Sequence, residues 1–165
     1  MATKLSNTDR YAATPERLLD MMRSEEYWPA KYEALGELEF TLQEFAQDGD
    51  ALSVTSRRVV PADLPGFAKK IVGDKTVVVQ SERWRKDGTG YTCDFSVSLD
   101  KVPGGMTGWM KIVAVGESES DWILEYRIKV GIPLVGGKFE GVMKGETEAS
   151  LKKEFAFNSR WLSSH

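Results

Sequence analysis

Two arginines stand in the same phase as apolar residues along segments with the pattern of strands. The alternating runs that contain them are Leu52, Val54, Ser56, Arg58 and Val77, Val79, Ser81, Arg83. An inward-pointing arginine is costly unless it is paired, and its fork of N–H donors suits a carboxylate or phosphate group. The spacing therefore predicts an anchor for an internal carboxylate or for an anionic part of a ligand.

Both arginines also have a simpler interpretation. Near a strand end, an arginine can reach solvent along its apolar stem, and a β-bulge can reverse the phase of a strand. Trp84 lies in the phase opposite to Arg83. One of these two side chains must therefore point outward unless such a bulge exists.

Other side chains that could do chemistry are scarce. The sequence has one histidine, His165 at the last position, and one cysteine, Cys93. A histidine-based triad, a histidine-rich zinc site, a Cys–His nucleophile and an internal disulfide each need a residue that is missing. We expect Cys93 to be a small buried hydrophobe, and Glu146 to be either a buried acid or a solvated residue beside an apolar stripe. No catalytic residue, metal site or cofactor is predicted.

The composition is that of an ordinary globular protein. The 165 residues carry 22 Lys and Arg against 25 Asp and Glu, for a net charge of −3. At roughly 100–200 residues per domain, this length predicts one domain over residues 1–165. The slightly acidic balance argues against nucleic acid as a partner, and no apolar run approaches the roughly 18–20 residues that span a bilayer. With one cysteine and no signal-like N-terminal stretch, we expect a cytoplasmic protein without stable membrane insertion.

The hydrophobic period changes twice along the chain. Thr14 and Pro15 mark the start of two short helices that end at Gly36, where the period changes from helical to alternating. The alternation continues through about six strands, interrupted by a short amphipathic helix that ends at Gly73. From Gly136 onward the period is helical again. The sequence thus predicts an α+β fold with the order strand, two helices, six antiparallel strands and a long C-terminal helix.

Several residues in this order form a recognisable pattern: Trp28, the segment Leu64–Phe67, Trp84, the segment Pro133–Glu140 and Trp161. With them the chain resembles the START-like, or helix-grip, superfamily, which also contains pollen-allergen and polyketide-cyclase groups. Within it, the chain is similar to a bacterial family described only as a domain of unknown function, number 2505. The resemblance implies a strongly curved antiparallel sheet of about seven strands, wrapped around the C-terminal helix. It also implies an apolar cavity that typically binds lipids or other hydrophobic small molecules, but no particular substrate.

Two apolar sets are candidates for the wall of such a cavity. The terminal helix carries Phe139, Val142 and Met143 at helical spacing, and the strands place Tyr91, Phe95, Met110, Ile112, Tyr126 and Ile128 on the inward face. Each set is either filled core or ligand-facing wall, and periodicity does not distinguish the two. Gly108 favours open space because it leaves a gap in a row of side chains. Phe67 and Ile71 are expected to form a movable lid over the entrance.

These features favour non-enzymatic binding of a hydrophobic small molecule or lipid, with Arg58 and Arg83 completing the site. Two alternatives stay open. One is a cyclase- or hydratase-type enzyme that uses the same cavity, and the other is an interaction domain without a ligand that uses an exposed Trp109. We expect a monomer or a homodimer.

Overall fold

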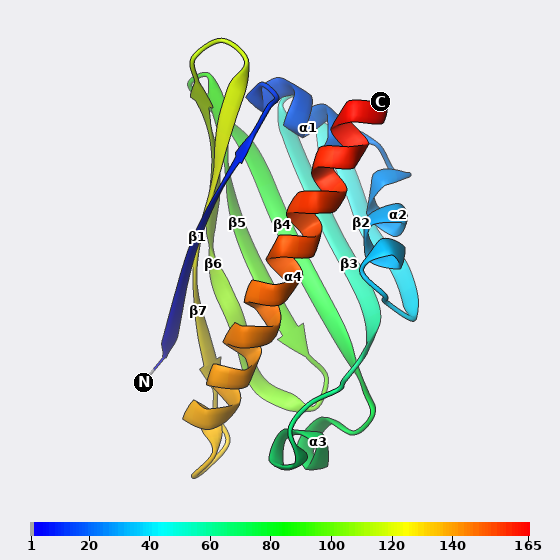
Figure 1. Ribbon diagram of the computed structural model, residues 1–165, viewed down its shortest axis with the longest axis vertical. Coiled ribbons are helices and arrows are strands. Elements are labelled where there is room, and N and C mark those ends of the chain that lie inside the picture. The colour runs from blue at the N-terminus through cyan, green and yellow to red at the C-terminus, as the bar shows by residue number, and fades with distance from the viewer. Residues whose placement is uncertain (1) are drawn as a thin grey trace.

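Seven antiparallel strands form one sheet in the order β1-β7-β6-β5-β4-β3-β2. The computed structural model describes residues 2–165 and is shown in Figure 1. Its elements are β1 (Thr3–Tyr11), α1 (Pro15–Arg23), α2 (Tyr27–Ala34), β2 (Glu39–Asp48), β3 (Ala51–Pro61), α3 (Gly66–Val72), β4 (Lys75–Asp87), β5 (Gly90–Leu99), β6 (Val102–Val115), β7 (Glu119–Val130) and α4 (Gly136–Ser164). Strands β2 to β7 form a meander, and β1 pairs with β7 at one edge. The helix-grip fold expected from the sequence is confirmed.

The helix boundaries follow local sequence signals. The Thr14 side chain accepts a hydrogen bond from the Arg17 amide (3.3 Å), and Pro15 is the first residue of α1. Pro29 lies in the first turn of α2, where its missing N–H breaks no helical hydrogen bond. Gly36 adopts a φ of 87° between α2 and β2, a conformation that is strained for any residue with a Cβ atom. The two predicted short helices are therefore present and separate.

Helix α4 lies across one face of the sheet, running obliquely to the strands (Figure 1). Its first turn is fixed by Glu140, whose carboxylate accepts hydrogen bonds from the Thr3 hydroxyl (2.8 Å) and the Val130 amide (2.9 Å). Its last turns are fixed by Asn158, which accepts a hydrogen bond from the Tyr27 hydroxyl (2.6 Å). One end of α4 is thus tied to β1 and β7, and the other end to α2.

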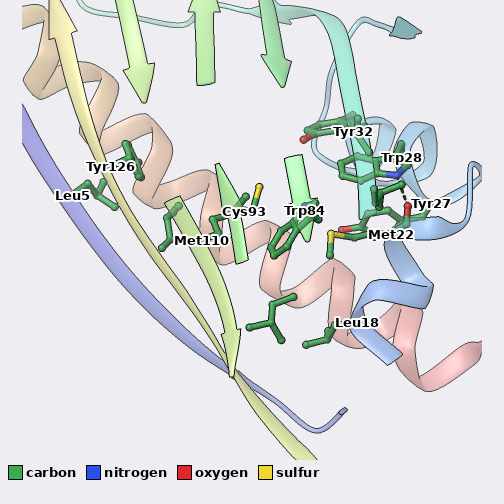
Figure 2. Packing of buried hydrophobic residues seen from close by; sticks show 14 of the residues in the cluster. Leu5, Leu18, Met22, Tyr27, Trp28, Tyr32, Trp84, Cys93, Met110 and Tyr126 are labelled. Atoms are coloured by element: carbon green, nitrogen blue, oxygen red, sulfur yellow. Dashed lines mark hydrogen bonds between the residues drawn. The ribbon is translucent and has the colours of Figure 1, made fainter. Parts of the chain in front are cut away.

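Large side chains fill the space where α1 and α2 approach the sheet and α4. We call this region the packed end; it comprises Leu18, Leu19, Tyr27, Trp84 and Tyr91, each with at most 1% of its surface exposed. Figure 2 shows Leu18, Tyr27 and Trp84 among the buried side chains here. The region is a filled hydrophobic core.

The residues of β4 that point inward are not those that the sequence pattern predicted, namely Val77, Val79, Ser81 and Arg83. The buried residues of this strand are Thr76, Val78, Glu82 and Trp84. Arg83 lies on the outer face, where its guanidinium pairs with Glu44 (2.8 Å). The prediction that Arg83 points inward is therefore wrong, because the much larger apolar side chain of Trp84 takes the inward position. Strand β3 has the predicted phase, with Arg58 inward and paired in register with Val78.

Candidate ligand-binding cavity

A cavity of about 410 Å³ lies between the inner face of the sheet and α4. Its apolar wall includes Val78, Phe95, Val97, Leu99, Met106, Met110, Leu124 and Tyr126 from the sheet, and Phe139, Val142, Met143 and Leu151 from α4. The volume lies within the range of roughly 300–1,000 Å³ that is usual for small-molecule sites.

The structure divides the residues that the sequence proposed for the site. Those that line the cavity are Arg58, Phe95, Met110, Tyr126, Phe139, Val142 and Met143. Ile112 and Ile128 point inward but are completely packed, and Tyr91 is buried with its hydroxyl bonded to Glu16. These three residues belong to the filled core rather than to the cavity wall.

Phe67 and Ile71, the expected lid, lie on α3 outside the lining of the cavity. Both are half-buried against the hydrophobic core, and Leu64, just before α3, is part of the cavity wall. The Lys138 ammonium lies 4.2 Å from the centre of the Phe67 ring, which joins α3 to the first turn of α4. A movement of α3 over the cavity stays a prediction.

A glycine brings two aromatic rings together on the cavity wall. Tyr126, Gly108 and Phe95 lie opposite one another on three adjacent strands. A Cβ atom on Gly108 would come within 2.5 Å of the Tyr126 Cβ, so this row has space for only two side chains. The Phe95 and Tyr126 rings meet across the glycine in a T-shaped pair with centroids 5.7 Å apart.

The Tyr126 hydroxyl is buried and has no hydrogen-bond partner. Burial raises the pKa of Tyr126 to about 12. The Thr147 hydroxyl donates its hydrogen bond to the Met143 carbonyl (2.8 Å). At neutral pH the cavity wall therefore carries a neutral phenol that can both donate and accept a hydrogen bond.

A chain of polar side chains crosses the sheet on the other side of the cavity. Arg58, only 8% exposed, has its Nε 3.5 Å from Glu37 Oε1 and donates from Nη1 to Gln80 Oε1 (3.1 Å). Gln80 donates to Glu82 (2.8 Å), which also accepts a hydrogen bond from the Trp84 indole (2.9 Å). We call Glu37, Arg58, Gln80 and Glu82 the polar chain. Glu37 is the internal carboxylate that an inward Arg58 requires.

The pairing in the polar chain is incomplete at Glu37. The Oε2 atom of Glu37 is buried without a hydrogen-bond partner, and Arg58 Nε, although close to Glu37, forms no hydrogen bond either. Burial raises the pKa of Glu37; Arg58 opposes this rise and Glu154 adds to it. Over residues 2–165, the buried side-chain polar atoms that lack a partner belong to Glu37, Arg58 and Tyr126, and all three residues line the cavity.

Lys31 is a second buried cation beside the cavity. Its ammonium is 3.2 Å from Glu154 of α4 and 4.7–5.1 Å from the ring centres of Tyr27, Trp28 and Tyr32. Burial alone would lower the pKa of Lys31, but Tyr27, Tyr32 and Glu154 outweigh this effect and raise it. Lys31 therefore stays an ammonium ion, and it joins α2 to α4 rather than serving as an amine nucleophile.

Sequence reasoning missed most of the charged residues of the site, among them Glu82, Lys31 and Glu37. Glu82 shares the phase of Trp84, so the correct phase of β4 would have placed it inward. Lys31 lies one helical turn from Tyr27 and Trp28, a spacing that places all three on neighbouring faces of α2. Glu37 follows a turn glycine and has no comparable signal.

Two reactive side chains have the environments expected from the sequence. Cys93 is fully buried and burial raises the pKa of its thiol, while Glu146 lies exposed at the edge of the cavity. Among residues 2–165 no group of three or more His, Cys, Asp or Glu side chains is arranged to hold a metal ion. None of the helices in this part of the chain is both long and apolar enough to span a membrane.

A family comparison agrees with this architecture. The model of a family described as "Protein of unknown function (DUF2505)" matches residues 6–162. The chain belongs to the DUF2505 family. A comparison with curated proteins found no match.

Solved structures similar to this DUF2505 chain share its fold. A START superfamily protein from Mycobacterium smegmatis has a TM-score of 0.64 at 18% identity, with 96% of this chain and 98% of that chain covered. A Thermus thermophilus protein gives the same score and identity over 94% and 96% of the two chains. The Zhui aromatase/cyclase from a Streptomyces species has a TM-score of 0.56 at 11% identity, over 98% and 92%. The chain therefore has the same fold as these proteins.

Proposed function

We propose that this DUF2505 protein binds a hydrophobic small molecule in the cavity between the sheet and α4. The observation that carries the proposal is that the unpartnered buried polar atoms of Glu37, Arg58 and Tyr126 all belong to residues of the cavity wall. A buried polar group without a partner costs about 1–3 kcal/mol, so such groups are uncommon in a finished core. A ligand that supplies the missing partners recovers this free energy on binding.

The apolar wall supports the same proposal. Burying apolar surface contributes about 25 cal/mol per Å², or about 2.5 kcal/mol for every 100 Å² removed from water. The methionines of the wall, Met106, Met110 and Met143, have flexible side chains that adapt to the shape of a bound molecule. The wall provides affinity, and the few polar atoms provide orientation.

Chemistry in the same cavity is the alternative, and it is favoured by one structural neighbour, the Streptomyces aromatase/cyclase. The side chains around this cavity offer little for covalent catalysis. Cys93 is buried outside the lining with a raised thiol pKa, Lys31 stays protonated, and Tyr126 stays neutral. A bound molecule recovered unchanged after long incubation supports binding alone, whereas its conversion supports the enzyme.

The binding test is the titration of an apolar fluorescent probe. We expect saturable binding with a dissociation constant in roughly the micromolar range, about −8 kcal/mol. Val142→Trp, which fills the cavity from α4 without burying a charge, should weaken binding at least tenfold. Met110→Asp should do the same from β6, and Val113→Asp on the outer side of β6 is its matched control, because Val113 is 44% exposed. No saturable binding to the wild type, or equal binding to Val142→Trp, contradicts the proposal.

A further inference from the structure

The charged side chains around the cavity are mostly acidic. Carboxylates come from Asp9, Glu37, Glu82, Glu146 and Glu154, and cations only from Lys31, Arg58 and Lys153. Lys31 is paired with Glu154. An anionic ligand therefore has no unpaired buried cation to meet, and the wall carries an excess of negative charge.

Arg58, the anchor that the sequence suggested for an anion, is already neutralised within the polar chain. Its guanidinium lies beside Glu37, donates to Gln80, and stacks 4.2 Å from the centre of the Tyr32 ring. A ligand carboxylate at Arg58 would lie beside the Glu37 carboxylate and near Glu82, which Gln80 links to Arg58. Like charges so close oppose each other, and a carboxylate that competed with Glu37 for Arg58 would leave Glu37 without its counter-ion, which is strongly unfavourable.

The three groups that lack a partner differ in what they require. Arg58 Nε is a donor, and it faces Glu37 Oε1 at 3.5 Å. Glu37 Oε2 is a buried carboxylate oxygen and can only accept while it is ionised. Tyr126 is only 2% exposed and lines the cavity from β7, which β6, β5 and β4 separate from β3 on the same sheet. Its unpartnered hydroxyl can donate or accept a hydrogen bond. A hydroxyl or ammonium group satisfies Glu37, whereas a carboxylate cannot.

We infer that the cavity selects apolar molecules whose head group is a hydroxyl or an amine that donates a hydrogen bond to Glu37, over the corresponding carboxylic acids. This inference rests on the proposed function and specifies its ligand class. The apolar body lies against Met110, Phe139 and Met143, and Tyr126 meets a second polar atom of the molecule. Arg58 is then a positioning residue that holds Glu37 ionised.

The first test compares three ligands with the same chain, decan-1-ol, decylamine and decanoic acid, as competitors of the apolar probe at pH 8. At this pH the acid is ionised and the amine is protonated. We expect the alcohol and the amine to displace the probe at concentrations at least tenfold lower than the acid. An acid that competes as well as the alcohol overturns the inference while leaving the proposed function standing. If the probe binds and none of the three ligands displaces it, the inference is overturned and the proposed function stands; if the probe itself does not bind, both are overturned.

The second test changes Glu37 alone. Glu37→Gln keeps the shape of the side chain and removes its charge, so we expect amine binding to weaken about tenfold and acid binding to strengthen about tenfold. Glu39→Gln, two residues along on the exposed side of β2, is the matched control and should keep the wild-type order of the ligands. An unchanged order in Glu37→Gln contradicts the inference. If Glu37→Gln does not fold, the inference is tested by the relative affinities of the three ligands for the wild type, as in the first test.

Discussion

In the packed end, the polar atoms of large buried side chains all have partners. The Tyr27 hydroxyl donates to Asn158, the Trp84 indole to Glu82, and the Tyr91 hydroxyl to Glu16. A short distance along the same sheet and the same helix, the cavity wall presents Glu37, Arg58 and Tyr126 with atoms that have none. One face of one sheet thus contains both a region whose hydrogen bonding is complete and a region where it is not.

The packed end and the cavity wall also differ in the types of side chain that they contain. Tryptophan, tyrosine and leucine fill the packed end, whereas the cavity wall combines leucine and aromatic side chains with valines and the flexible methionines Met106, Met110 and Met143. Because protein interiors are normally close-packed, a large cavity beside a well-filled core is a local property of these residues and not a looseness of the fold. The comparison teaches that the packed end provides stability and that the cavity is available for binding.

The largest effect on stability should come from the packed end. Trp84→Ala removes a large buried ring and leaves Glu82 without one of its donors, so we expect a loss of about 3–5 kcal/mol in the free energy of unfolding. Chemical denaturation of the two proteins measures this difference. A loss below about 1 kcal/mol contradicts the description of this region as a filled core.

Glu140 tests how α4 is held beside the cavity. Glu140→Gln replaces a carboxylate oxygen by an NH₂ group facing the donors Thr3 and Val130, at a cost of about 1–3 kcal/mol. Burial alone would raise the pKa of Glu140, but the hydrogen bonds from the Val130 amide and Thr3 outweigh it and lower the pKa.

The pH dependence of this variant follows from the sign of that shift. A carboxyl whose pKa is lower in the folded state stabilises the protein above its unfolded-state value, ordinarily 4.5, and loses this contribution as the pH falls through the folded value. The stability difference between wild type and Glu140→Gln should therefore be largest above about pH 5 and shrink below it. Glu148→Gln on the exposed side of α4 is the control and should show no such trend.

Adding the same atoms in each region sharpens the comparison further. Val54→Met in the buried core should cost about 1–3 kcal/mol, because a close-packed site has no room for a longer side chain. Val142→Met points into the cavity and should change stability by about 0.5 kcal/mol or less, or stabilise the protein. Thermal unfolding of both variants measures the two changes in stability. Equal losses of stability would mean that the cavity is not open space.

The smallest effect should come from the arginine on the outer face. Arg83→Met removes an exposed ion pair with Glu44, which is worth about 0–1 kcal/mol, and should leave probe binding unchanged. An effect of Arg83→Met on binding would show that the outer face also takes part.

Much of the fold could be predicted from the sequence, because it depends on short-range patterns. Thr14 and Pro15 mark a helix start, and the changes of period at Gly36 and Gly136 separate helices from strands. The phase of β4 could not be read from its valines, since Val77, Val78 and Val79 are consecutive and fit either face. Only the large apolar side chain of Trp84 indicates which face of β4 points inward.

The polar part of the cavity depends on contacts that are distant in the sequence. The need of an inward Arg58 for an anion was predictable, but its partner, Glu37, is set by the pairing of β2 with β3. The pairing of Lys31 with Glu154 depends on where α4 crosses α2. Such partners follow from the packing of whole elements, and no local pattern specifies them.

The most direct test of binding in the cavity uses the methionine methyl groups as reporters. Met106, Met110 and Met143 line the cavity, whereas Met21 is buried outside its lining. In a protein labelled with ¹³C at the methionine methyls, we expect added decan-1-ol to shift the signals of Met106, Met110 and Met143 saturably, with one dissociation constant, and to leave Met21 in place. The absence of a saturable shift at these three methyls, or a shift confined to Met21, would contradict the account.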